Sequence, residues 1–151
     1  MPLGSGSRNS RPPFAPANAR DRKPLDLTIL PESFAVSRLP ASAPAPAWAG
    51  TGHLQSVTRT REELSVVCRT DAVPPDVASE PGWRAIRVAG TLDFSMTGVL
   101  ASLAAPLADA NLSIFALSTH DTDYVLVKDD ALERAVAALT AAGHRFPPGA
   151  P

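Results

Sequence analysis

Asp123, Thr119 and His120 are the residues whose types best suit binding of a charged small molecule. Asp123 follows a short polar loop and precedes an apolar run, a position typical of the mouth of a strand. A carboxylate there can pair with an ammonium or guanidinium group. Thr119 and His120 offer further contacts from the same loop. The alternative is a solvated turn in which Asp121 and Thr122 bond local backbone groups, and it explains Asp121 better than Asp123.

A glycine stands where a helix is expected to begin. Apolar residues repeat at helical spacing from Met96 to about Ala110, so Gly98 falls in the first turn. The free N–H groups at a helix start carry partial positive charge and suit a carboxylate. Without a Cβ, Gly98 lets a ligand approach its own N–H and that of Val99. The alternative is that this glycine only eases a turn or a helix–sheet contact.

These two features together match an α-amino acid, which needs an anion site and an acceptor for its ammonium. Catalytic chemistry has no comparable signal, because the sequence lacks G-x-S-x-G, a Walker glycine loop and a dinucleotide fingerprint. We therefore expect no enzymatic activity and no cofactor. A metal site built from His120, Asp121 and Asp123 is conceivable, but neighbours on an extended segment point apart, so no metal is expected.

Composition limits the possible partners. The 151 residues are 44% hydrophobic and 19% charged, which predicts a buried core in one compact body or in two small units. The net charge of -1 favours neither nucleic acid nor an anionic membrane. No apolar stretch approaches the roughly 20 residues that span a bilayer, and no signal pattern is present, so a cytoplasmic location is expected. The single cysteine, Cys68, excludes an internal disulfide and is expected in the core.

The first half of the chain reads as short strands. Residues 1–23 are rich in Gly, Ser, Pro and Arg and are expected to form a disordered extension. Alternation of Leu25, Leu27 and Ile29 with polar residues predicts a strand that Pro31 ends. Further extended runs are 34–39, which returns after a turn at Glu32 and Ser33, and the hairpin 53–60 with 63–69. Three prolines within 71–82 indicate a linker, placed at 74–82.

The second half alternates strands and helices. Residues 83–89 predict a strand, and the helix ending near Ala110 contains Pro106, which should remove a hydrogen bond. Two strands (112–118 and 124–128) follow, and Asp130 with Glu133 resembles a capping box for a helix that Gly143 closes. This order predicts an α+β sandwich with helices on one face of a sheet. Residues 147–151 are expected to be a disordered tail.

Three runs of the second half, residues 90–100, 107–114 and 118–127, resemble the second unit of tandem ACT-like proteins. They are similar in particular to bacterial ACT-domain proteins related to the CASTOR arginine sensor. Residues 27–30, 34–39 and 62–68 resemble the reduced first unit of that group. The resemblance implies two ferredoxin-like ACT units with antiparallel sheets, a strand-rich first unit at 24–73 and a second at 83–146.

The resemblance also implies a ligand, usually an amino acid, held between the two units. It adds Ser65 and Val66 to the site, across the unit interface, and favours the binding role of Gly98. Ser95 and Met96 occupy positions where an acidic pair holds the cationic side chain in CASTOR, so a neutral or smaller amino acid fits at least as well as arginine. We expect a sensor module; the alternative is a ligand-free interaction module, and the expected partners include another protein or a second copy.

Overall fold

The computed structural model describes residues 23–92 and 97–148 of the chain. Within these ranges six strands and two α-helices are joined by short connections and 3-10 turns. The strands are β1 (Leu27–Leu39), β2 (Ser56–Arg59), β3 (Leu64–Arg69), β4 (Ser79–Val88), β5 (Ile114–Ser118) and β6 (Asp123–Lys128), and the helices are α1 (Val99–Asp109) and α2 (Leu132–Ala141). The 3-10 turns are η2 (Ala47–Ala49), η3 (Thr70–Ala72) and η4 (Asp129–Ala131).

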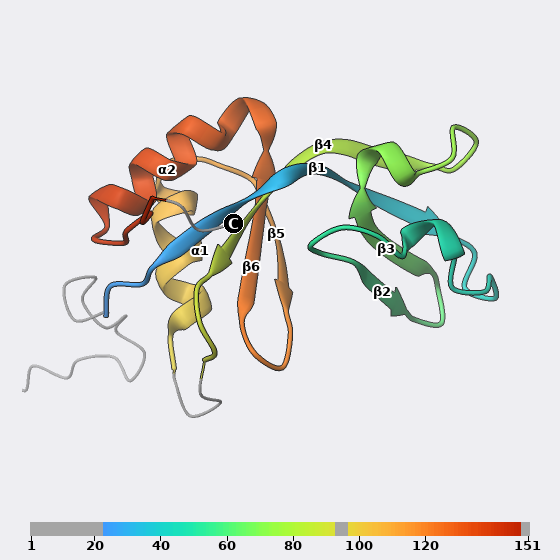
Figure 1. Cartoon of the computed structure of the whole chain (residues 1–151), viewed down its shortest axis with the longest axis horizontal. Coiled ribbons are helices and arrows are strands. Elements are labelled where there is room, and N and C mark those ends of the chain that lie inside the picture. Colours follow the sequence, from blue (N-terminus) through green and yellow to red (C-terminus); the bar gives the residue numbers. More distant parts are fainter. Residues whose placement is uncertain (1–22, 93–96, 149–151) are drawn as a thin grey trace, which may run out of the picture.

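All six strands belong to one antiparallel sheet in the order β2-β3-β1-β4-β6-β5. The expectation of separate sheets for two units is therefore wrong. The two long central strands, β1 and β4, run through both halves, so that β2 and β3 extend the sheet at one end and β5 and β6 at the other (Figure 1). The α+β class and the helices on one face are confirmed.

Two prolines that were expected to interrupt strands lie inside them. Pro31 does not end the first strand, and Glu32 and Ser33 are not a turn, because all three belong to β1. Pro81 likewise lies in β4, so residues 79–82 of the expected linker are strand. Both prolines fall where the register between β1 and β4 shifts, between Ile29 and Ser33 and between Phe34 and Val36 of β1. A residue without an N–H is tolerated at such bulges.

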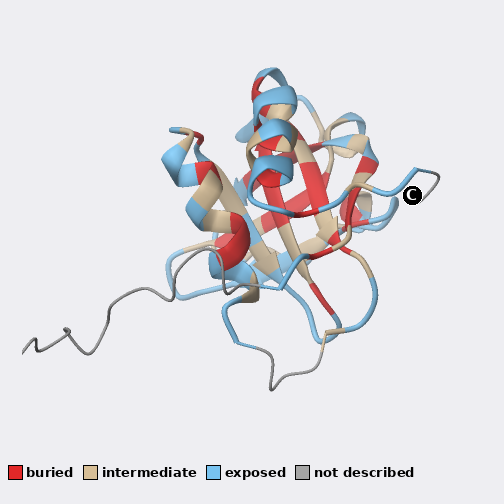
Figure 2. Ribbon diagram, turned by 90° about the vertical axis from the view of Figure 1, so that its left-hand side faces the viewer, coloured by how far each residue is buried: buried red, intermediate tan, exposed pale blue. Residues whose placement is uncertain are grey.

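Helices α1 and α2 cover the sheet face formed by β1, β4 and β6 and bury the largest core cluster between them (Figure 2). Alternate strand residues face this layer, as period-two patterning requires. Completely buried members from three strands are Leu27, Ile86, Val125 and Val127, and Leu103 and Leu107 project from α1. No described helix is long and apolar enough to cross a membrane.

The first half packs in two smaller clusters. Leu64, Val66 and Cys68 point to one side of β3 and lie under Ala49 of η2, with Trp48 partly buried beside them. The expectation that Cys68 is a core residue is confirmed. On the opposite side, Val67 joins a cluster with Leu30, Phe34, Leu54, Trp83, Ala85 and Leu126, which we call the central cluster because it includes residues from both halves.

The proline inside α1 is accommodated by a buried histidine. Pro106 has no N–H to donate to the carbonyl oxygen of Ser102, four residues earlier. Nε2 of His144 lies 3.0 Å from that oxygen and donates to it instead, while Nδ1 accepts the backbone N–H of Leu25 at 3.1 Å. His144 is 4% exposed. One imidazole thereby ties α1 to the start of β1.

We predict that His144→Leu lowers the free energy of unfolding by about 2–4 kcal/mol, because it leaves a buried carbonyl and a buried N–H without partners. Chemical denaturation measures this loss. The matched control is His120→Leu, whose imidazole is 82% exposed, and its effect should stay within about 0.5 kcal/mol. Equal effects of the two substitutions would contradict the bridging role of His144.

The ends of the helices differ in detail from the sequence expectation. Residue 96, the expected start of α1, lies outside the described residues, and the helix begins at Val99 with Gly98 as N-cap. The expected capping box of α2 is wrong: Ala131 is the N-cap and no side chain caps it, since the chain enters the helix through η4. Gly143 does follow α2 in the left-handed region, at φ 99°.

Candidate functional site

Helix α1 starts at an exposed glycine, Gly98, which has no side chain with which to cap the helix. Gly98 adopts φ 74°, a left-handed conformation that favours glycine, and a Cβ built there would meet no atom within 4 Å. Its carbonyl accepts the N–H of Ser102 at 2.9 Å, which begins the helical bonding. The first turn of α1 holds no acidic residue. The partial positive charge of the helix start therefore lies next to Gly98.

The β5–β6 turn is closed by hydrogen bonds of two threonines. Oγ1 of Thr119 accepts the N–H of Thr122 at 3.2 Å, and the carbonyl of Thr122 accepts the N–H of Thr119 at 2.9 Å. The hydroxyl of Thr122, 3% exposed, donates to the carbonyl of Val88 at 2.7 Å. The carbonyl of Asp121 accepts the N–H of Leu92 at 2.6 Å. The turn is thus fastened both to the end of β4 and to the segment leading towards α1.

Asp123 is the half-buried carboxylate of this turn. Its Oδ1 accepts the hydroxyl of Ser118 at 2.6 Å, and no described cation pairs with it. Asp121 instead is 64% exposed and contacts the exposed His120 at 2.9 Å. Figure 1 shows the β5–β6 turn and the beginning of α1 at the same end of the sheet. The structure therefore brings Gly98, Val99 and residues 119–123 to one end of the second half.

Ser65 and Val66 lie elsewhere. Val66 pairs with Ser37, near the end of β1. Asp123 is on the other side of the sheet: its neighbour Tyr124 pairs with Arg87 of β4, and Arg87 pairs with Thr28, near the start of β1. The nine steps from residue 28 to residue 37 span roughly 30 Å of strand at about 3.3 Å per residue. The side chain of Val66 is also completely buried. Within a single chain, Ser65 and Val66 therefore do not lie near Gly98, Val99 and residues 119–123. Ser95 and Met96 lie outside the described residues.

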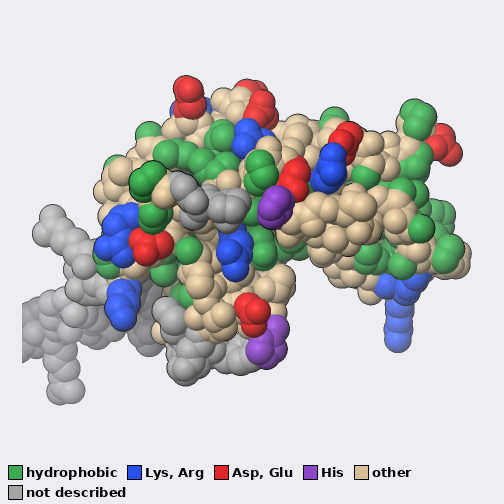
Figure 3. All heavy atoms as spheres, in the orientation of Figure 1, with side chains coloured by type: hydrophobic (Ala, Val, Ile, Leu, Met, Phe, Trp, Pro, Cys, Tyr) green, Lys and Arg blue, Asp and Glu red, His purple; other side chains and the backbone are tan. Residues whose placement is uncertain are grey.

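The hollows described in the structure are away from the β5–β6 turn. One of about 430 Å³ lies between α1 and α2, next to Pro106 and His144. Another of about 480 Å³ is bordered by Ser65 and Arg38, and a third of about 360 Å³ lies beside Glu32. Among the described residues, no group of three or more His, Cys, Asp or Glu side chains is placed to hold a metal ion. Positive and negative side chains alternate over the face drawn in Figure 3.

The sequence did not predict the contacts that two polar residues of the site, Ser118 and Thr122, make in the structure. The hydroxyl of Ser118 holds Asp123, and the hydroxyl of Thr122 anchors the turn to β4 in addition to the local bonds made by the Thr122 backbone. Serine and threonine next to a turn are a weak signal, because their usual partners are local. The contact from Thr122 to Val88 spans 34 positions and depends on the tertiary fold.

Comparison with known proteins defines the class. A family model described as the ACT domain matches residues 78–141, and a second, described only as an N-terminal domain, matches 32–76. A crystal structure of a protein from Agrobacterium tumefaciens is 40% identical, with a TM-score of 0.79, over 83% of this chain and 94% of that one. The regulatory subunit of aspartate kinase from Thermus thermophilus shares the fold, at 14% identity and a TM-score of 0.54, over 80% of this chain and 99% of that one. The chain belongs to the ACT-domain family.

Within that family the chain is related to the CASTOR arginine sensor. It is 36% identical over 58 residues to the human protein named cytosolic arginine sensor for mTORC1 subunit 1. That match takes in 38% of this chain and 18% of the sensor. The chain therefore spans well under two thirds of the curated relative, and the relationship concerns one part of that protein.

Proposed function

We propose that this chain is a non-catalytic regulatory module that binds an amino acid at the end of the sheet where α1 begins. The carboxylate of the ligand would lie at the N–H groups of Gly98 and Val99, and its ammonium would pair with Asp123. The observation that carries the proposal is a glycine N-cap, with no described atom within 4 Å of its Cβ position, at the same end as a half-buried carboxylate without a described cationic partner. Membership of the ACT family and the name of the arginine sensor support it.

The electrostatics of this end suit a zwitterion. A helix start attracts negative charge within its first turn, by about 0.3–1 kcal/mol at an exposed surface. A hydrogen bond to a charged group adds about 1.5–3 kcal/mol. Neither interaction alone gives useful affinity, so an α-amino acid, which engages both, is the class of ligand that we favour. Thr119 and His120 border the same turn and are proposed to contact the ligand side chain.

The identity of the amino acid depends on the positions that face its side chain. Ser95 and Met96 carry no charge, so Asp123 is the one acidic side chain assigned to the site. A second carboxylate would be needed to compensate both the ammonium and a guanidinium group. We therefore propose a neutral amino acid ahead of arginine. The cytosolic location in the name of the relative supports the same setting for this chain.

Ser65 is proposed to contribute to the ligand site only in an assembly of two chains. Ser65 on β3 and Asp123 on β6 lie beside opposite ends of β1, so a site containing both residues requires a second chain. Ser65 is half-buried beside a hollow, which leaves its hydroxyl available to such a partner. Val66 would contribute through its backbone, since its side chain is buried.

The experiment that tests this placement is a titration followed by two-dimensional NMR of backbone amides. The amides of Gly98, Val99 and residues 119–123 should shift together when the amino acid is added. Gly98→Ala should weaken binding about fivefold or more, because its Cβ hinders the approach of the ligand carboxylate to the backbone N–H groups. Shifts that cluster around Ser65 or between α1 and α2 instead would place the ligand in another hollow and refute the site.

The second candidate is an interaction module without ligand, and the outer edge of β5 favours it. β5 is an edge strand paired with β6 alone, its register with β6 is regular, and its sequence Ile-Phe-Ala-Leu-Ser contains neither charge nor proline. Edge strands of soluble proteins usually carry such protection against pairing. A second copy added at β5 would extend the sheet symmetrically. Dimerisation without a response to any amino acid would favour this function.

A further inference from the structure

The loop that precedes β2 crosses from the first half of the molecule to the second. Residues 50–55, which we call the strap, leave η2 and reach towards β5 and β6 before β2 begins (Figure 1). Leu54 of the strap is 5% exposed and packs into the central cluster with Trp83 and Leu126. The strap therefore covers the sheet face opposite the helices.

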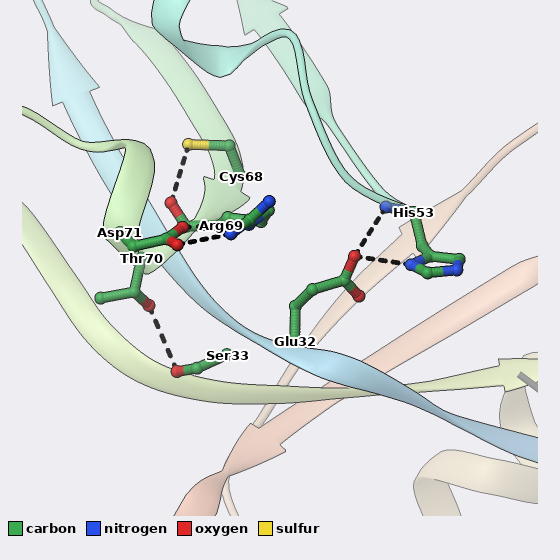
Figure 4. A network of polar contacts seen from close by, with 7 residues as sticks. All are labelled: Glu32, Ser33, His53, Cys68, Arg69, Thr70 and Asp71. Atoms are coloured by element: carbon green, nitrogen blue, oxygen red, sulfur yellow. Dashed lines mark hydrogen bonds and ion pairs between the residues drawn. The ribbon is translucent and has the colours of Figure 1, made fainter.

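A single carboxylate holds the strap to the sheet. Oε1 of Glu32, on β1, accepts the backbone N–H of His53 at 3.0 Å and the ring Nδ1 of His53 at 2.6 Å (Figure 4). We call these two bonds the clasp. Gly52 makes the close approach possible, because its φ is 99° and a Cβ there would lie 2.8 Å from Cδ of Arg69. Arg69 is itself bonded to Asp71 at 3.0 Å.

Little else fastens the strap. Of residues 51–55, only Leu54 is buried, and no bond joins the backbone of these residues to another backbone group of the described chain. The central strand β1 beneath is paired on both sides, with β3 and with β4. Segments with few buried apolar groups and few backbone bonds open at the lowest free energy. The strap can therefore open while the sheet stays folded.

Two polar atoms beside the strap and in the central cluster are buried and unsatisfied. Oε2 of Glu32 and Nε1 of Trp83 are buried and have no hydrogen-bond partner among the described residues. Burying such atoms without partners is unfavourable, and solvent reaches them when the cover is removed. This relief offsets part of the apolar contact that Leu54 loses on opening.

We propose that the strap is a releasable cover, closed by the Glu32–His53 clasp, whose opening exposes Trp83 and the central cluster to solvent without unfolding the sheet. The charged groups around Glu32 are His53 on the strap and Arg69 on β3, with Asp71 behind Arg69. This proposal stands apart from the amino-acid site at α1.

Acid should weaken the clasp. Burial by itself raises the pKa of Glu32, but the hydrogen bonds from His53 outweigh it and hold the pKa below the ordinary 4.5. A carboxyl whose pKa is lower in the folded state stabilises that state above its unfolded value and loses this contribution as the pH falls through the folded value. The strap is therefore closed at neutral pH, and its closure weakens as the pH falls below 4.5 and through the lowered pKa of Glu32.

Fluorine NMR on the full chain labelled with 5-fluorotryptophan tests the strap. The chain has two tryptophans, and Trp48 lies in a different cluster, so it serves as an internal reference. Broadening by a water-soluble nitroxide should increase several-fold for Trp83 in Glu32→Gln and in His53→Ala, with Trp48 unchanged. Lowering the pH should have the same effect on the wild type and little further effect on Glu32→Gln. Glu63→Gln, which breaks an exposed contact to Arg38 away from the strap, is the matched control and should behave as wild type.

Two results would overturn the strap. In the first, nitroxide broadening of Trp83 does not increase in either clasp variant or at acidic pH. This result would show that the clasp does not keep the strap closed. Equal broadening of Trp83 and Trp48 would show global unfolding in place of local release. A circular dichroism melt of each variant at neutral pH separates these cases.

Discussion

Replacing Phe34 by alanine will lower the free energy of unfolding by about 3–5 kcal/mol, in a single cooperative transition. Phe34 is completely buried at the centre of β1 and lies in the central cluster. Its neighbours in the sheet are Arg69 of β3 and Trp83 of β4, so it stands where the two halves meet. Removing the ring leaves a cavity that both halves share.

Chemical denaturation followed by circular dichroism and by tryptophan fluorescence checks this expectation. The two signals should move together, because Trp83 lies beside Phe34 and Trp48 lies in the first half. Val57→Ala is the control, since Val57 is 44% exposed on the edge strand β2 and its truncation should cost less than about 0.5 kcal/mol. Two separate transitions, only one of them shifted by Phe34→Ala, would contradict a single body.

Most elements of the second half could be predicted from sequence because their patterns are local. Helical spacing of Leu103 and Leu107 identified α1, and Gly143 identified the end of α2. The error at Pro31 has a clear cause: a proline normally interrupts a strand, and only the register shift against β4 shows that its missing N–H is not needed. That shift depends on pairing between distant segments, which periodicity does not reveal.

The parts of the candidate site that depend on local sequence could also be predicted. The turn around Asp123 and the glycine at the start of α1 are local features, and the structure places them at one end of the molecule. Ser65 was expected near them from the family resemblance, but its position depends on which stretch of β1 pairs with β3. The role of His144 was missed because its partner Leu25 lies 119 positions away in the sequence.

Asp123→Asn is expected to weaken amino-acid binding about tenfold or more. The substitution removes the negative charge assigned to the ligand ammonium, and a charge-assisted hydrogen bond is worth about 1.5–3 kcal/mol. An asparagine has nearly the same shape and still has an oxygen for the hydroxyl of Ser118, so the turn should remain closed. The loss should therefore appear in affinity and not in the thermal stability of the free protein.

Asp121→Asn is the matched control. Asp121 is in the same turn, but it is 64% exposed and contacts His120 instead of facing the proposed ligand. Its substitution removes the same charge from the same loop. It should leave the affinity within about twofold of wild type, since exposed charges are screened by solvent and salt.

The central claim is tested most directly by isothermal titration calorimetry of the full chain against each common amino acid, repeated with Asp123→Asn and Asp121→Asn. We predict that one amino acid or a few related ones bind the wild type and Asp121→Asn with similar affinity, and that Asp123→Asn binds them about tenfold or more weakly. Absence of binding by every amino acid, or equal binding to Asp123→Asn, would contradict the proposed sensor.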